Sequence, residues 1–597
     1  MKGKNTMKIA AFLLQLFSLQ IIVNAQEKTV NKYPQGYFRN PLGIPFSVTG
    51  NFGELRPNHW HMGLDLRTNQ KENQPVFAAA NGYLAHVGIR SQSFGRYIII
   101  NHPNGLSTLY AHLNKFFPEL EQYVEEQQHK KESWAIELDF TETQFPVRQG
   151  KLIAYSGNTG GSQGPHLHFE IRDTKTDRSL NPLLFGFEIR DDISPVITRL
   201  GMYDRGLSTY QQSPKLIPLK KTDSGYYTLP RKILTGNRKI SFAIGAYDRI
   251  TGSATADGIY SAFFYVDEKP QAGFILDNID YYESGYVNAQ IDYRFKFNGG
   301  SNLQHLSRLP GDKGNVYQEI ESEYGIIELS DTVEHSVRIE ISDAHDNLSE
   351  LFFTIQYSES LSRQDKKNSL QKQFVPGYIN LLEEKDFEIY IPENCLYDTV
   401  SSLYYRNDFS VPNAITAMHQ LNDPSIPVHD QFTVRIKPSV AVGAEQRNKI
   451  VMVREWRGRR SVQKAIWQKE WLTGSFSDFG NFRAFTDLIP PVINAPGKGK
   501  DTLDLSPLNR IVFTPIDNYG IKSFRAELNG KWLKFTNDKA RSFIYIFDEK
   551  CPFGVHELKI KVEDIVGNVT EKTWWFKRYP YTPPKKKVVK KKRKRKK

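Results

Sequence analysis

The sequence is poor in cysteine, in long apolar segments and in helical periodicity. Only two cysteines, Cys395 and Cys551, occur among 597 residues, which excludes a disulfide scaffold and a cysteine-rich zinc module. They fall in different expected modules, so we expect two separate, buried thiols. The H-E-x-x-H motif of helical zinc proteases and the G-K-[ST] ending of phosphate loops are also missing. Several common kinds of catalytic site are therefore excluded.

One apolar run does occur, at Ile9–Val23, directly after a basic start. Small residues follow it at Val23-Asn24-Ala25, so we expect a signal peptide at 1–25 and a mature chain that begins near Gln26. The alternative is a membrane anchor, which needs roughly 20 apolar residues, and this run is shorter. No other segment is apolar enough to span. We therefore expect an exported protein, periplasmic or secreted, with no transmembrane span in its mature chain.

The positive charge of the sequence is confined to its two ends. The net charge is +13, but the tail Lys585–Lys597 alone carries 11 basic residues and no acidic one. Without the two ends the chain is close to neutral, which argues against a nucleic-acid partner. We expect the tail to be disordered. It either binds an anionic envelope surface, such as lipid headgroups or wall polymers, or simply keeps the protein soluble.

Strand signals dominate the rest of the chain, and aromatic residues, which pack well in strands, reach 13%. Two segments, His335–Asp343 and His556–Asp564, share an alternating pattern with His and Asp at the same separation, and Asn347 and Asn568 follow in the turns. Such repetition predicts similar β-sandwich modules. The expected fold is mostly β: an N-terminal antiparallel β-sheet domain, several Ig-like modules and the basic tail.

These patterns predict a series of domain boundaries. The expected units are the signal peptide 1–25, the N-terminal β domain 26–187 with an insertion at 114–145, Ig-like modules at 188–270 and 271–360, a linker at 361–375, a β-rich module at 376–486, an Ig-like module at 487–578 and the tail 579–597.

Histidines and one aspartate mark the N-terminal β domain as the chemical part of the chain. His61 and Asp65 lie four residues apart, His112 follows Tyr110 in an apolar run, and His166 and His168 alternate along one strand. Imidazole and carboxylate are good zinc ligands, and a catalytic zinc takes three of them and keeps an open position. The pattern therefore indicates a metal site.

The spacing limits how these residues can meet. His166 and His168 share one strand face about 6.6 Å apart, so one can bind a metal while the other reaches its water. In a straight strand His61 and Asp65 would be about 13 Å apart, so we expect a bend between them, which Gly63 permits. We also expect Tyr110 and His112 to share one strand face.

The combination resembles the lysostaphin/LytM-type zinc metalloendopeptidases, which cut peptide bonds in peptidoglycan. That family shows H-x-x-x-D, then Y-x-H, a glycine-rich segment and H-x-H. The sequence has all four, over about residues 41–186 and with Gly157–Gly164 as the glycine-rich segment. The His–Asp step of four, where zinc D-Ala-D-Ala carboxypeptidases have seven, favours an endopeptidase.

The resemblance implies one zinc ion per chain and a peptidoglycan substrate. It implies His61, Asp65 and His168 as zinc ligands and His112 and His166 as the catalytic pair, with the division of labour between those two left open. The alternative function is a catalytically silent protein that binds the cell wall or activates another hydrolase; proteolysis of exported proteins is a weaker option. The insertion 114–145 departs from the family and is either a surface elaboration or a wall of the substrate groove.

Overall fold

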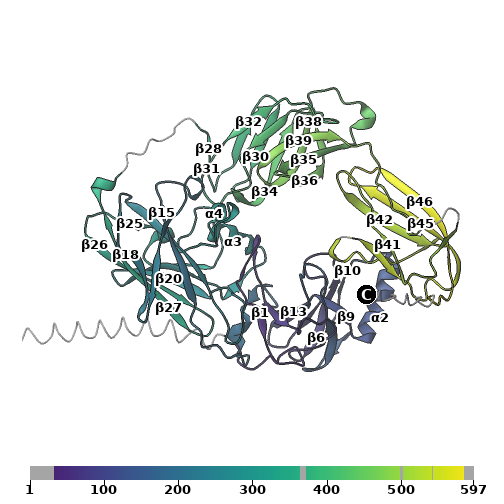
Figure 1. Cartoon of the computed structure of the whole chain (residues 1–597), viewed down its shortest axis with the longest axis horizontal. Coiled ribbons are helices and arrows are strands. Elements are labelled where there is room, and N and C mark those ends of the chain that lie inside the picture. Colours follow the sequence, from purple (N-terminus) through teal and green to yellow (C-terminus); the bar gives the residue numbers. More distant parts are fainter. Residues whose placement is uncertain (1–32, 363–370, 498–501, 541, 584–597) are drawn as a thin grey trace, which may run out of the picture.

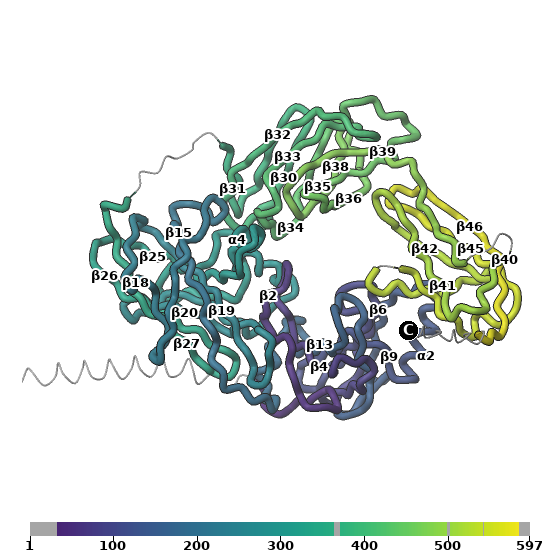
Figure 2. Tube along the Cα trace, in the orientation of Figure 1, coloured from purple at the N-terminus to yellow at the C-terminus, as the bar shows by residue number. Residues whose placement is uncertain are grey.

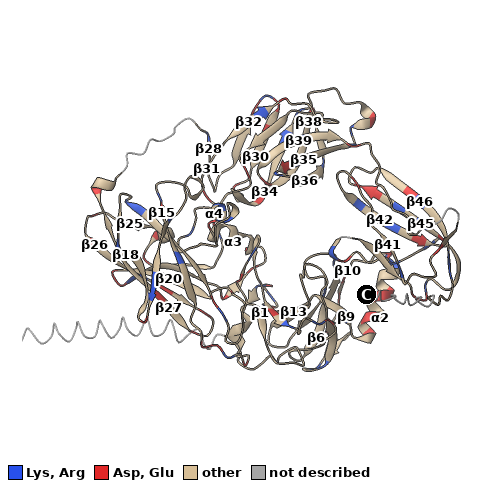
Figure 3. Ribbon diagram, in the orientation of Figure 1, with Lys and Arg blue, Asp and Glu red and all other residues tan. Residues whose placement is uncertain are grey.

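The computed structural model describes residues 33–362, 371–497, 502–540 and 542–583. The expected signal peptide and the basic tail Lys585–Lys597 lie outside these residues, and both stay predictions. Strands are the main secondary structure of the described chain and helices are few, so the mostly β prediction is confirmed. Its modules follow one another around a ring, and the last module returns to the first domain (Figures 1 and 2). Basic and acidic residues are interspersed along the ribbons of all the modules, in keeping with a nearly neutral body (Figure 3).

The N-terminal domain is built on a large antiparallel sheet with a small sheet packed beside it. The large sheet has the order β1-β4-β13-β8-β7-β6-β10 and the small one β5-β12-β9. Apolar side chains between them, such as Leu66, Ile98 and Phe169, form a common core. The bounds are β1 (Val48–Gly50), β4 (Leu64–Arg67), β5 (Pro75–Phe77), β6 (Gly82–Ile89), β7 (Arg96–Asn101), β8 (Leu106–Ala111), β9 (Leu113–Phe116), β10 (Ile136–Asp139), β12 (Leu152–Ser156) and β13 (His166–Asp173).

The insertion 114–145 forms helix α2 (Pro118–Lys131) and edge strand β10, which pairs with β6. The helix has a proline at its start, acidic residues in its first turn and basic residues in its last turn, each of which favours a helix at that place. It contacts the C-terminal module: Lys534 Nζ donates to Glu125 at 2.7 Å, and Arg525 Nη1 donates to Glu132 at 2.7 Å. The insertion is thus a part of the N-terminal domain that the C-terminal module contacts where the ring closes.

The two Ig-like modules expected at 188–270 and 271–360 share one sandwich in the structure. Its sheets have the orders β16-β15-β19-β23 and β17-β18-β27-β26-β20-β21-β24, and one core fills the space between them. Strands β18 and β27 lie more than 100 residues apart in sequence yet pair in parallel. Strands from the two ranges are interleaved in both sheets, since β19 pairs with β23 and β20 pairs with β26, so the two ranges fold together.

The strands of this sandwich, and two short strands beside it, have the following bounds: β14 (Ser179–Leu180), β15 (Val196–Asp204), β16 (Lys215–Ile217), β17 (Leu219–Thr222), β18 (Gly225–Thr235), β19 (Lys239–Tyr247), β20 (Ser261–Val266), β21 (Lys269–Ile275), β22 (Asn278–Ile279), β23 (Gln304–His305), β24 (Tyr317–Glu319), β26 (Glu334–Ser342) and β27 (Leu348–Tyr357).

Two further modules complete the ring, each with its own core. The third module has sheets β29-β30-β34-β38-β37 and β32-β33-β39-β35-β36, and the last has β40-β46-β45-β42-β43 with the pair β41-β44. Cys395 and Cys551 are buried and unbonded in these two cores. The Ig-like classification and the module boundaries stay predictions. The bounds are β29 (Asn380–Glu383), β30 (Phe387–Ile391), β32 (Tyr404–Asn407), β33 (Met418–Leu421), β34 (Pro427–Ile436), β35 (Ile450–Trp456), β36 (Arg459–Lys464), β37 (Ile466–Gln468), β38 (Trp471–Asp478), β39 (Gly480–Thr486), β40 (Thr502–Asp504), β41 (Arg510–Phe513), β42 (Ile521–Leu528), β43 (Lys531–Trp532), β44 (Phe543–Ile546), β45 (Gly554–Asp564) and β46 (Val569–Arg578).

The N-terminal domain does not end cleanly at its expected boundary. Phe52, Trp60 and Met62 belong to the core of the neighbouring sandwich, and β14 pairs with β22 across the junction. Gly53 has a φ of +80°, and an added side chain there would collide with Leu276. The loop that leads to His61 is therefore held by the sandwich as much as by its own domain.

No helix among the described residues has the length and apolar character that crossing a membrane requires.

Candidate metal centre and active site

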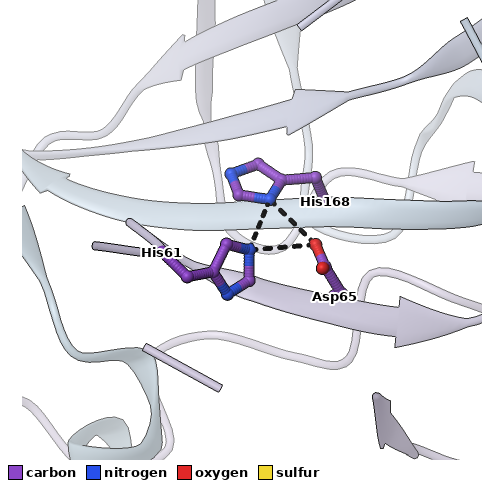
Figure 4. A group of neighbouring side chains, drawn as sticks. All are labelled: His61, Asp65 and His168. Atoms are coloured by element: carbon purple, nitrogen blue, oxygen red, sulfur yellow. Dashed lines mark hydrogen bonds and ion pairs between the residues drawn. The ribbon is translucent and has the colours of Figure 1, made fainter. Parts of the chain in front are cut away.

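Three side chains from separate segments converge on one point. His61 precedes β4, Asp65 lies in β4, and His168 lies in β13, which pairs with β4 so that His168 is opposite Asp65. His61 Nε2 and His168 Nδ1 each lie 3.0 Å from Asp65 Oδ1 and 3.0 Å from one another. The three side chains point toward a common centre (Figure 4), and all are buried.

This donor set suits zinc. Tetrahedral ligands at about 2.0–2.1 Å from zinc stand roughly 3.3 Å apart, close to the separations seen here. Two imidazole nitrogens and a carboxylate oxygen are typical zinc donors. Burial opposes ionisation of Asp65, but the histidines around it hold the pKa of its carboxyl well below the usual value. A negative charge is therefore available at the centre for a cation.

Each of the two histidines is oriented by its other ring nitrogen. His61 Nδ1 lies 2.7 Å from the carbonyl oxygen of Asn51 and donates to it, which leaves Nε2 for the centre. His168 Nε2 lies 2.7 Å from Glu170 Oε1 and donates to it, which leaves Nδ1 for the centre. The sequence pattern gave no acceptor for either nitrogen, although Glu170 follows His168 on the same strand face.

Glu170 is completely buried and held by three further groups. Arg172 Nε donates to it at 2.7 Å, Ser179 Oγ at 3.2 Å, and the Tyr281 hydroxyl also donates to it. Burial opposes its ionisation, but Arg172 and His168 lower the pKa of Glu170 to about 2. Glu170 is therefore a permanent carboxylate behind His168. Tyr281 comes from the sandwich, and nothing in the sequence near it signals this contact.

Two more histidines stand beside the three ligand candidates. His166 Nε2 lies 3.3 Å from Asp65 Oδ1, and its Nδ1 donates to the Gly164 carbonyl at 2.8 Å. The His112 ring centroid is 4.7 Å from that of His166, and His112 Nδ1 donates to the Thr159 carbonyl at 2.8 Å. Burial, followed by the neighbouring histidines, lowers the pKa of His112 to about 3. All five predicted residues thus meet in one place, while their roles stay predictions.

One expectation about β8 and the histidine that follows it is wrong. Tyr110 and His112 do not share a face, because His112 follows the end of β8 with a left-handed φ of +59°. Tyr110 points into the core, where its hydroxyl accepts from the Ala79 amide at 2.8 Å. The local reversal turns the His112 ring toward the metal-ligand candidates, an orientation that an extended strand would not give.

The site lies in a cleft of about 900 Å³ between the N-terminal domain and the sandwich. The five residues line it together with Arg56, whose Nη2 donates to Asp65 Oδ2 at 2.8 Å. Tyr281, Ser284 and Gly285 form the opposite wall. None of the lining residues, all of them described, belongs to the insertion 114–145. The structure thus gives that insertion the role of a docking platform and not of a cleft wall.

The glycine-rich loop 157–164 borders the cleft and touches the last module of the ring. Lys539 Nζ donates to the Ser162 carbonyl, and the Gly160 amide donates to Asp538 Oδ1 at 2.8 Å. Ser162 Oγ in turn lies 3.1 Å from His166 Nδ1. A short chain of contacts therefore joins the C-terminal module to His166.

Comparison with known proteins identifies this domain. The model of "Peptidase family M23" matches residues 59–129 and 137–182, the segments that contain all five site residues. The chain belongs to peptidase family M23. A second model, "Zu5-like domain", matches residues 371–487 and covers the expected module 376–486. The predicted lysostaphin/LytM-type resemblance is confirmed.

Three relatives show how far the similarity extends. DD-carboxypeptidase/endopeptidase Mpg of Neisseria meningitidis is 35% identical over 112 residues, which are 19% of this chain and 20% of the relative. Peptidoglycan DD-endopeptidase ShyA of Vibrio cholerae is 26% identical over 24% of this chain and 29% of the relative. Lipoprotein NlpD of Yersinia enterocolitica is 32% identical over 19% of this chain and 89% of the relative. The chain spans less than a third of the length of the first two, and the similarity lies in the M23 domain.

Proposed function

We propose that the protein is an exported, zinc-dependent endopeptidase that hydrolyses peptide bonds in peptidoglycan cross-links. The observation that carries this proposal is the convergence of His61 Nε2, Asp65 Oδ1 and His168 Nδ1 in an open cleft, with two further histidines beside them. Relatives of the M23 domain include proteins named as peptidoglycan endopeptidases. Their substrate is the reason to propose peptidoglycan, and with it a periplasmic or secreted location.

The three ligand candidates would hold the zinc ion, which when bound supplies Lewis acidity and lowers the pKa of a coordinated water. His112 and His166 each use Nδ1–H on a backbone carbonyl, so each presents Nε2 as a proton acceptor. A neutral imidazole in this position can accept a proton during attack and return it to the leaving amine. Burial lowers the pKa of His112 to about 3, which keeps that ring neutral at pH 7 but also makes it a weak base.

The surrounding residues keep this geometry in place. Glu170 and the Asn51 carbonyl fix the two ligand histidines, and Arg56 binds the outer oxygen of Asp65. Such partners raise metal affinity by about 10–100-fold in other zinc sites. The cleft of about 900 Å³, walled in part by Tyr281, Ser284 and Gly285 of the sandwich, has room for a peptide segment.

The proposal is tested with the purified mature chain. We expect about one zinc per chain by mass spectrometry, as for any three-ligand catalytic site, and release of soluble fragments from cell-wall sacculi. His168→Ala and Asp65→Ala should lose the metal. His166→Ala should keep the metal but lose activity by about 10²–10⁴-fold. His59→Ala is the matched control for zinc content, because His59 is exposed on the same segment and its Nδ1 contacts the Pro57 carbonyl.

Identification of the released fragments from defined muropeptides would name the bond that is cut. A zinc-loaded wild type that releases nothing from any sacculus would contradict the proposal. That result would support the alternative, a catalytically silent protein that binds the wall or activates another hydrolase.

A further inference from the structure

Two clusters of aspartates lie outside the M23 site. The first triad is Asp191, Asp248 and Asp343, and the second triad is Asp487, Asp517 and Asp564. Within each triad one oxygen from every carboxylate lies within 4.8 Å of the others. The first triad stands where the M23 domain joins the sandwich, just before β15. The second stands directly after β39, where the third module joins the last.

The triads are built in the same way. Asp343 Oδ1 accepts from the amides two and four residues on, and its Oδ2 accepts from Asn347 Nδ2 at 2.7 Å. Asp564 repeats all three bonds, with Asn568 in the place of Asn347.

In both triads the aspartate at the junction, Asp191 or Asp487, is held by the same kind of hydrogen bond. Asn347 Nδ2 also donates to the Asp191 carbonyl at 3.2 Å, and Asn568 Nδ2 to the Asp487 carbonyl at 3.1 Å. Two distant parts of the chain therefore carry one common arrangement, which joins a linker to a turn of the module that follows it.

Buried oxygens without partners indicate a place where a ligand would fit. Asp248 is 2% exposed, and its Oδ1 has no hydrogen-bond partner among the described residues. The Asp191 side chain is 1% exposed, and its Oδ2 also has no such partner; its nearest ion-pair neighbour is His345 Nδ1, 3.7 Å away. In the second triad, Asp487 is 1% exposed, and the Oδ2 atoms of Asp487 and Asp517 have no partner among the described residues.

In each triad, the residue at the junction (Asp191 or Asp487) and one residue of the following module (Asp248 or Asp517) thus have a carboxylate oxygen without a hydrogen-bond partner among the described residues. Asp257 adds a further buried carboxylate next to the first triad. It is 3% exposed, neither of its oxygens has a hydrogen-bond partner among the described residues, and it faces Asp248 across an antiparallel bridge.

Electrostatics favours a cation at such a place. Buried carboxylates repel one another strongly, and burial without a partner is costly. In the described part of the chain no lysine or arginine forms an ion pair with any of the six aspartates. Lys449 is near the second triad, but its Nζ donates to the Val566 carbonyl at 3.3 Å. Without a bound ion, each triad would have to take up protons or separate.

The donors also indicate which ion fits. All of them are carboxylate oxygens, which suit hard cations, and none is an imidazole or a thiolate. Calcium takes six to eight oxygen ligands in a flexible geometry, whereas magnesium requires near-ideal octahedral geometry and keeps several waters. We propose that the two triads are calcium sites, each of which clamps a junction of the ring to the module that follows it.

Calcium binding to the zinc-loaded full-length mature chain tests this inference. Equilibrium dialysis with radioactive calcium should give two ions per chain, at dissociation constants of about 10⁻⁴–10⁻³ M, as in extracellular modules. Asp248→Asn and Asp517→Asn should each bind one ion, and the double variant none. Asp346→Asn is the matched control, since Asp346 is exposed in the same turn as Asp343 and its φ of +64° suits asparagine. It should still bind two.

Calorimetry separates an ion site from a merely structural carboxylate. Calcium should raise the melting temperature of the wild type by about 5 °C. Without calcium, Asp248→Asn and Asp517→Asn should melt at or above the wild type, because the neutral amide relieves repulsion. A structural aspartate would instead lower the melting temperature in both conditions.

A second measurement needs no variant. In hydrogen exchange of the wild type, calcium should protect the turns at 343–348 and 564–568 but leave β13 unchanged. Absence of calcium binding at millimolar concentration, unchanged exchange in these turns, or magnesium binding in place of calcium would overturn the inference. Because the zinc site stays loaded throughout, these outcomes are independent of peptidase activity.

Discussion

Removal of every residue after 187 would expose the loop that carries His61. In the intact chain Phe52, Trp60 and Met62 are at most 3% exposed, and all three pack into the sandwich core. Full burial of one such side chain contributes about 1.5–3 kcal/mol, so the fragment would lose about 5–9 kcal/mol of stabilisation. Whole domains are stable by only about 5–15 kcal/mol. We therefore expect fragment 26–187 to be barely folded.

The loss also reaches the metal site itself. Asn51 exchanges hydrogen bonds with Gly258 at 2.7 and 2.9 Å, and its carbonyl orients His61. Trp60 Nε1 donates to Gln290 Oε1 at 2.9 Å. Without the sandwich these anchors disappear, so the fragment should bind zinc more weakly even where some of it is folded.

The assay compares fragment 26–187 with fragment 26–360, which keeps the sandwich. Thermal unfolding followed by circular dichroism and zinc content by mass spectrometry should both favour the longer fragment. If fragment 26–187 unfolds at the same temperature and holds zinc as tightly as fragment 26–360, the argument that the sandwich completes the site is refuted.

Three further predictions concern single side chains and pH. Tyr281→Phe removes the hydroxyl that donates to Glu170, the carboxylate that orients His168, and should weaken zinc affinity by about 10-fold. Competition with a chelator measures this affinity, and an unchanged value would contradict the support of Glu170 by Tyr281. Lys539→Ala frees the glycine-rich loop and should raise KM and the amide exchange of that loop without change in zinc content; an unaltered loop would show that ring closure does not reach the cleft. Burial lowers the pKa of His305 to about 3 and that of His102 to about 4. Because the unfolded state, with a pKa of about 6.5, binds these protons first, stability is full above pH 6.5 and should fall by about 2 kcal/mol for each histidine between pH 7 and pH 5. Urea unfolding would detect this fall, and a His102→Gln variant should reduce it by about 2 kcal/mol; an unreduced fall in that variant would contradict the part assigned to His102.

Much of the chemistry could be predicted because it depends on residue types at short spacings. The alternation of His166 and His168 placed both on one strand face, and the distance argument for His61 and Asp65 required the bend that the structure shows before β4. The orientation of His112 could not be predicted, since an isolated positive φ in a non-glycine residue leaves no clear mark in a strand-like sequence. The expectation for Tyr110 failed for the same reason.

Contacts between distant segments were beyond the reach of sequence patterns. Tyr281 and Glu170 are separated by 111 residues, and the partners of Lys539 lie almost 400 residues before it. The repeated Asp343 and Asp564 were visible as similar strands, and Asp191 and Asp487 each begin the pattern Asp-x-Ile-x-Pro-Val-Ile, at 191–197 and 487–493. The sequence did not show that these residues meet one another, or that Asp248 and Asp517 join them. Such contacts depend on how the sheets pack against one another, and many sequences with alternating apolar residues suit the same packing equally well.

The amino-acid sequence by itself determined the mostly β character of the protein, because strand periodicity is a local property, and its resemblance to a known family implied the five residues to which the proposal assigns the chemistry. Only the tertiary structure decided that two expected modules are one sandwich, that this sandwich supplies a wall of the cleft, and that six aspartates gather into two triads. These three features depend on packing and on charges that come from distant parts of the sequence. The contacts that stabilise them form only when the whole chain folds.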